Sequence, residues 1–115
     1  MAKLEKQKFS TPVTEKSIYS LVGLSMRQGA VESGSFSAEK AIKAGNAKLV
    51  IIAEDASGNT RKEFTDMCTY YHVPFCIFGT KDTLGHAIGK EFRSSCAITD
   101  KSLAEAFLKS LREDS

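Results

Sequence analysis

Apolar and polar residues follow two different periods along this chain, and the two periods predict helices interleaved with strands. Apolar residues recur every three or four positions in five segments, as on one face of an amphipathic helix. We expect these helices at about 13–27, 38–45, 57–71, 80–89 and 100–111. Short apolar runs bounded by glycine, proline or polar residues are typical of buried strands. We expect strands at 30–32, 48–53, 75–78 and 96–98.

Local capping signals set the expected ends of several helices. Thr11 and Pro12 offer a capping hydroxyl and a proline for the first helical position. Gly45 is placed to end the second helix, and Asp100 or Ser102 to begin the last. Strands that alternate with helices at these lengths predict an α/β fold, a three-layer α/β/α sandwich with a small mixed sheet of about four strands.

The length of 115 residues fits one domain, which we expect at 11–115 after a flexible basic tail at 1–10. The longest apolar run, 49–53, is far too short to span a bilayer, and no secretory signal is visible. The three cysteines (Cys68, Cys76 and Cys96) are odd in number and form no CxxC pair. These features predict a protein of a reduced, cytoplasmic compartment.

The net charge is only +2, but its distribution is uneven. Residues 1–48 hold eight Lys and Arg against four Asp and Glu, whereas residues 49–115 hold eight against ten. A mildly basic first half is suited to contact phosphates. An ordinary solvated surface accounts for the same distribution.

The chain lacks the sequence motifs of common nucleotide-binding sites and of serine hydrolases. Three weaker patterns allow chemistry: the Glu54–Asp55 pair as magnesium ligands, Cys68 with His72 at i,i+4 spacing as metal ligands, and His86 as a general base. Strand-end caps, a core cysteine and exposed histidines explain the same residues. We therefore expect no enzyme, no metal, no cofactor and no small-molecule substrate.

The turn at 33–37 and the helix after it form a first candidate binding site. A helix start presents free N–H groups and the positive end of the helix dipole, which suit a phosphate. Ser35 and Ser37 add hydroxyl donors, and Lys40 and Lys43 add cations.

Phe36, within the same turn, has two interpretations. An exposed aromatic ring beside hydrogen-bond donors can stack on an unpaired base. Alternatively, the ring folds back against the helix as a hydrophobic staple. The sequence pattern favours neither.

The polar loop at 89–95 forms a second candidate site. It carries Lys90, Phe92 and Arg93 and ends in small hydroxyl residues. In a helix-covered sheet this loop can lie at the same end as the 33–37 turn, so that the two loops grip a bent RNA from both sides.

Three longer segments carry a resemblance to a known family. They read E-K-A-I-K-A-G-N-A-K-L-V-I-I-A-E-D at 39–55, Y-H-V-P at 71–74 and L-G-H-A-I-G-K-E at 84–91. Together with Gly34, they resemble the L7Ae/L30e-type family of ribosomal proteins, in particular its short bacterial YlxQ-like branch. The resemblance runs from about residue 18 to 107.

The resemblance implies an α/β/α sandwich that binds kink-turn RNA, a sharply bent duplex with tandem sheared G·A pairs. In the family, a G-x-N-E-x-x-K stretch at a helix start contacts those pairs. Gly34 and Lys40 match this motif, whereas Phe36 and Ser37 stand where the family has its guanine-reading Asn and Glu. The loop after the L-G-x-A-x-G helix packs on a flipped-out nucleotide in the family, which implies this role for residues 90–95.

From the residues and the resemblance together, we predict a monomeric ribosomal or ribosome-associated protein whose partner is structured RNA. The predicted RNA-binding residues are Gly34, Ser35, Phe36, Ser37, Lys40, Lys43, Lys81, Lys90, Phe92, Arg93 and Ser94. The alternative is a protein-interaction adaptor on the same fold, which the missing Asn and Glu readers favour. Lys40 and the cations of the 90–95 loop favour RNA.

Overall fold

A computed structural model of the chain describes residues 10–113, of which Ser10 begins the first helix. The rest of the tail predicted at 1–10 lies outside the described residues. The elements in chain order are α1 (Ser10–Arg27), β1 (Val31–Ser33), α2 (Ser35–Lys43), β2 (Leu49–Ile52), α3 (Gly58–Tyr71), β3 (Phe75–Ile77), α4 (Lys81–Ala87), β4 (Ser95–Ile98) and α5 (Lys101–Glu113). None of the helices in this described part is long and apolar enough to cross a bilayer.

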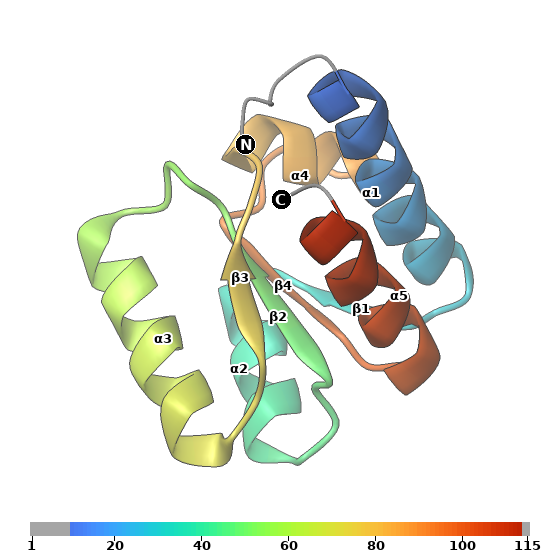
Figure 1. The fold of residues 1–115 in the computed structure, drawn as a ribbon. Helices are drawn as coiled ribbons and strands as arrows, with labels where there is room; N and C mark the ends of the chain where they lie inside the picture. The colour runs from blue at the N-terminus through green and yellow to red at the C-terminus, as the bar shows by residue number, and fades with distance from the viewer. Residues whose placement is uncertain (1–9, 114–115) are drawn as a thin grey trace.

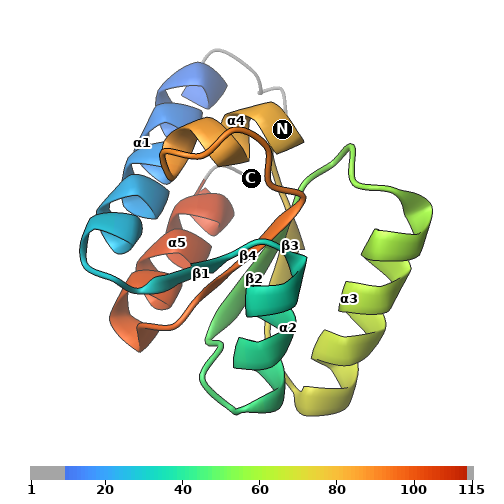
Figure 2. The ribbon, with the colours of Figure 1, turned by 180° about the vertical axis from the view of Figure 1, so that it is seen from behind.

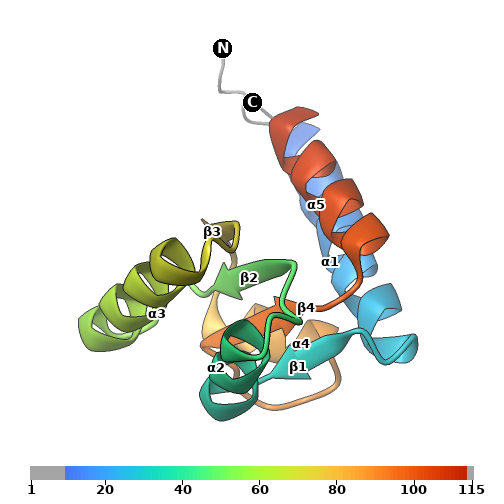
Figure 3. The same cartoon turned by 90° about the horizontal axis from the view of Figure 1, so that it is seen from below.

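The four strands form one mixed sheet in the order β1-β4-β2-β3, in which only β2 and β3 run parallel. Helices α1 and α5 cover one face of the sheet, α2 and α3 cover the other, and α4 lies at one end against α1 (Figures 1 and 3). This arrangement confirms the predicted three-layer sandwich with a small mixed sheet.

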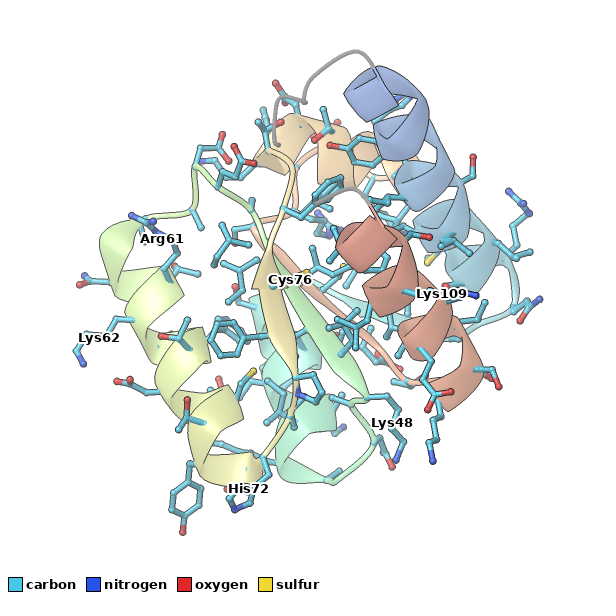
Figure 4. All side chains as sticks on the ribbon, in the orientation of Figure 1. Lys48, Arg61, Lys62, His72, Cys76 and Lys109 are labelled. Atoms are coloured by element: carbon cyan, nitrogen blue, oxygen red, sulfur yellow. The ribbon has the colours of Figure 1, made fainter. Side chains whose placement is uncertain are left out.

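The antiparallel pair of β2 and β4 lies at the centre of the molecule. Every residue of both strands is buried, and their register places Ile51 opposite Cys96. On its other side Ile51 is in register with Cys76 of β3 (labelled in Figure 4). Burial raises the pKa of the Cys96 thiol to about 12, so this side chain stays protonated and packs as a small apolar group at neutral pH.

The prediction of a second buried strand at 75–78 is wrong. The strand is β3, at the edge of the sheet, where Phe75 is 39% and Ile77 is 42% exposed. Only alternate residues face the core, because side chains alternate between the two faces of a strand. Phe78 is one of these, and its ring lies 6.0 Å from that of Phe107 in α5.

The predicted ends are confirmed for α2, which is followed by Gly45 at φ 80°, and for α5, whereas α1 begins at Ser10, before the expected Thr11 cap. Ser57 accepts a hydrogen bond from the Thr60 N–H at the start of α3, and Asp100 accepts one from the Leu103 N–H at the start of α5. Tyr71, at the last position of α3, is 40% exposed.

We expect Ile51→Asp to unfold the protein, because it buries an unpaired charge in the central strand. The cost should be several kcal/mol, comparable with the total stability of a small domain. Ile77→Asp is the matched control, since this side chain is partly exposed at the sheet edge and its replacement should cost only ~1 kcal/mol. The measurement is thermal unfolding by circular dichroism. A cooperatively melting Ile51→Asp protein would contradict the central position of β2.

Candidate functional site

The start of α2 is an open helix end. Gly34 adopts φ 90° and ψ 158° immediately before the helix, a conformation that a residue with a Cβ rarely takes. Its N–H donates to the carbonyl of Ser95 (3.0 Å), which fixes this turn to β4. No side chain of residues 10–113 caps α2, so the N–H groups of its first turn and the positive end of its dipole are open to a ligand.

Phe36 lies within the first turn of α2, because the helix begins at Ser35 and not after the predicted 33–37 turn. The side chain of Phe36 is 80% exposed, so the hydrophobic-staple interpretation is wrong. Lys40 is exposed one turn further along, and Ser37 is half-buried. The helix start therefore combines free donors, an aromatic ring and a cation.

The α4–β4 loop folds back over α4. The Lys90 N–H donates to the Gly85 carbonyl (2.7 Å), and the Arg93 N–H donates to the Lys81 carbonyl (3.1 Å). The chain can approach this closely because residue 85 is glycine: a Cβ there would collide with the backbone of Glu91. The fold-back leaves the Phe92 side chain 60% exposed.

Arg93 brings this loop against the start of α2, as the loop's path in Figure 2 shows. Its Nε lies 3.8 Å from the position that a Cβ on Gly34 would occupy, and its Nη1 donates to the Phe92 carbonyl (2.6 Å). Among the described residues, two buried side-chain polar atoms lack a hydrogen-bond partner: Arg93 Nε and Ser95 Oγ. Both belong to residues 93–95, which meet the start of α2 at Gly34, and we call this contact the junction. The polar groups at the junction are incompletely satisfied within the protein.

A groove of about 480 Å³ continues from the helix start along the side of α2 next to β1, where Glu32 also lines it. Phe36, Ser37 and Lys40 line it together with Asn46 and Lys48, which the sequence analysis did not select. The chain reverses after α2, where the Asn46 N–H donates to the Ala41 carbonyl (2.9 Å), and this return brings both residues beside the helix. In the sequence alone, a lysine that follows a helix-ending glycine is only a weak indication of a binding surface.

Of the other predicted site residues, Lys43 and Lys90 lie apart from this junction, whereas Lys81 and Ser94 lie near it. Lys43 is in the last turn of α2, where its Nζ donates to Glu39 at 2.7 Å, and Lys90 lines a separate groove between α1 and α4. Lys81 and Ser94 bond there through backbone atoms: the Lys81 carbonyl accepts the Arg93 N–H, and the Ser94 carbonyl accepts the Ala53 N–H at 2.9 Å.

The residues considered for metal or acid–base chemistry have structural roles or are separate from one another. Asp55 accepts the Lys81 N–H at 2.8 Å and so fixes the start of α4. Cys68 is fully buried, which raises its pKa to about 11, whereas His72 is exposed at the left-handed C-cap of α3. His86 lines the groove between α1 and α4. Over residues 10–113, no three His, Cys, Asp or Glu side chains gather as metal ligands would.

Comparison with protein families gives a match over most of the chain. The model of the ribosomal protein L7Ae/L30e/S12e/Gadd45 family matches residues 16–107. This range contains α2, the α4–β4 loop and all four strands.

Individual relatives agree with the family match. The chain is 42% identical over 93 residues to the RNA-binding protein YlxQ of Bacillus subtilis, covering 81% of this chain and 93% of that one. It is 35% identical over 95 residues to the large ribosomal subunit protein eL8 of Picrophilus torridus, covering 81% and 75%.

Solved structures have the same fold. A Bacillus halodurans C protein of unknown function superposes with a TM-score of 0.79 at 30% identity, covering 83% of this chain and 96% of that one. The 15.5 kD RNA-binding protein of Giardia lamblia gives a TM-score of 0.74 at 24% identity, covering 87% and 86%, a likeness of fold alone.

We expect Gly85→Ala to displace the α4–β4 loop, because the added methyl group meets the Glu91 backbone. The cost should be ~1–3 kcal/mol, as for other overpacked sites. Gly58→Ala is the control: it also replaces a helical glycine, but nothing lies within 4 Å of the added methyl group. Denaturant unfolding and amide NMR shifts of residues 89–95 would measure both effects. Unchanged loop shifts in Gly85→Ala would contradict the close approach.

Proposed function

This chain belongs to the L7Ae/L30e/S12e/Gadd45 family of ribosomal proteins, and from that premise we propose that it binds folded RNA. The proposed interface is the start of α2 together with the α4–β4 loop. The observation that carries the proposal is the position of Arg93 against Gly34, which joins the two segments into one cationic surface. The names of the YlxQ and eL8 relatives, an RNA-binding protein and a ribosomal subunit protein, support binding over catalysis.

Electrostatics at the junction favour an anionic ligand. A guanidinium group near the positive end of a helix dipole is unfavourable unless an anion lies close to both. A phosphate beside Arg93 can accept hydrogen bonds from the guanidinium and from the free N–H groups of α2. Lys40 adds a further cation one turn into the helix.

The exposed aromatic rings favour RNA over an isolated phosphate. Phe36 and Phe92 are 80% and 60% exposed, each on a segment that meets at the junction. Unpaired bases of folded RNA stack on such rings, whereas bases inside a regular duplex are inaccessible to them. The surface therefore suits an RNA with extruded nucleotides.

We propose that the bound RNA is a kink-turn. This chain would contact its sheared G·A pairs through other groups than the Asn and Glu of the family motif. The family's Asn and Glu positions hold Phe36 and Ser37, which offer no carboxylate to a guanine edge. Stacking by Phe36 and donation from the first-turn N–H groups take the place of those contacts. The groove lined by Lys40 and Lys48 extends the surface along one arm of the bend.

Lys40→Ala should weaken binding to a kink-turn hairpin with tandem sheared G·A pairs and leave the melting temperature unchanged. Loss of one phosphate contact should also reduce the slope of log affinity against log salt by ~0.7–0.9. Lys109→Ala, an exposed lysine on α5, is the matched control and should change neither quantity. Fluorescence anisotropy across a salt series measures both. Equal affinity and slope for Lys40→Ala and the unmodified protein would remove Lys40 from the interface.

Phe36→Ala should cost ~1–3 kcal/mol of affinity for the same hairpin if the ring stacks on a base. The exposed position of the ring predicts little change in folding stability. Calorimetric melting and titration of the same sample separate the two quantities. Reduced stability without reduced affinity would assign the ring a structural role.

The double change Phe36→Asn with Ser37→Glu restores the family's readers. We expect it to sharpen discrimination between sheared G·A pairs and Watson–Crick replacements, because each good bidentate base contact is worth ~1–3 kcal/mol in DNA complexes. Parallel titrations of the two hairpins measure the ratio of affinities. Uniform weakening for both RNAs would indicate that the new carboxylate meets phosphates, and that the protein does not dock as the motif implies.

A further inference from the structure

A second groove, of about 660 Å³, lies at the opposite end of α2 from the proposed RNA interface. The end of α2, the end of α3 and the first turns of α5 enclose it. In Figure 4, Lys48 and His72, two of its lining residues, lie toward the same lower end of the molecule. Its floor is apolar: Val73 and Leu108 are half-buried and Pro74 is exposed.

The rim of this groove is cationic. Lys43, Lys48 and Lys101 line it against a single carboxylate, Glu105. Lys43 is paired with Glu39, whereas Lys48 and Lys101 form no ion pair with any described residue. Lys101 is in the first turn of α5, where the helix dipole disfavours a cation. Helix stability therefore does not explain its position.

We propose that this groove docks an acidic, amphipathic segment of a partner protein. Apolar side chains of the segment would cover the floor formed by Val73, Pro74 and Leu108, and its carboxylates would meet the lysines of the rim. Charge complementarity of this kind steers association and fixes orientation. An RNA backbone would satisfy the lysines but would leave the apolar floor uncovered, so the groove suits a peptide better.

The second groove shares Ala44 and Lys48 with the groove along α2, but none of its lining residues belongs to the start of α2 or to the α4–β4 loop. Helix α2 has nine residues, so its two ends are separated by ~14 Å at 1.5 Å per residue. RNA at the start of the helix and a peptide at its end can therefore be bound together. The proposal adds a protein partner to RNA binding and does not rest on it.

The test is an NMR titration of the full-length ¹⁵N-labelled protein. The probe is a synthetic 12-residue peptide with leucines at i, i+3, i+4 and i+7 and with Asp or Glu elsewhere. We expect amide shifts confined to 43–48, 71–74 and 101–108, with no change at 34–40 or 90–94. The same peptide with Asn and Gln in place of its acids should bind much more weakly.

Variants of one helix supply the matched control. Lys101→Glu should weaken peptide binding about fivefold, because it reverses a charge on the rim. Lys109→Glu makes the same charge change on an exposed residue of α5 that does not line the groove, and should leave the affinity unchanged. Leu108→Ser tests the floor, with a circular dichroism melt to confirm folding.

Two outcomes would overturn the proposal. Equal weakening by Lys101→Glu and Lys109→Glu, or amide shifts spread over the whole surface, would indicate non-specific attraction. A 12-base-pair RNA duplex without a kink-turn is titrated in parallel. If the duplex moves the amides at 43–48 and 101–108 and the peptide does not, the groove binds nucleic acid and not a protein.

Discussion

The antiparallel pairing of β2 with β4 is the constraint on which the rest of the molecule depends. The two strands are buried along their whole length, and their register sets where each neighbouring segment begins. Beyond the start of β4, the Ala53 N–H donates to the Ser94 carbonyl, and on the other side of β4 the Gly34 N–H donates to the Ser95 carbonyl. One pair of strands thus positions both the α4–β4 loop and the start of α2.

The charged and aromatic groups at this junction are held in place by a backbone that does not depend on them. Lys90 and Arg93 are anchored through their N–H groups to carbonyls of α4. The Phe92 side chain takes no part in these bonds and is 60% exposed. Arg93 Nε and Ser95 Oγ, which have no hydrogen-bond partner among the described residues, lie where the two segments meet.

Hydrophobic periodicity predicts the elements of this fold because each period is a local property of the chain. It predicts the strand β3 but not its position at the sheet edge. The run from Phe75 to Phe78 is as apolar as a central strand, and its position is decided by pairing with distant strands. The exposure of Phe36 was open for the same reason: a staple and an exposed ring have identical local sequences. Lys48 was missed because only the reversal of the chain after α2 brings it beside Lys40. The predicted helix-covered sheet already allowed the 33–37 turn and the 89–95 loop to lie at the same end, and the family resemblance assigned both to RNA binding.

The hydrogen bonds that shape the junction join main-chain atoms, so the side chains beside them can change during evolution without breaking these bonds. Gly34 and Gly85 are constrained by φ or by close approach, but the side chains at positions 35–37 and 92 take no part in those bonds. Mutations at these four positions can therefore change the proposed RNA surface while the main-chain bonds that shape it stay in place. A lineage can therefore exchange an Asn and a Glu for a Phe and a Ser in small viable steps. The backbone can therefore stay the same while substitutions at these positions change which ligand is preferred.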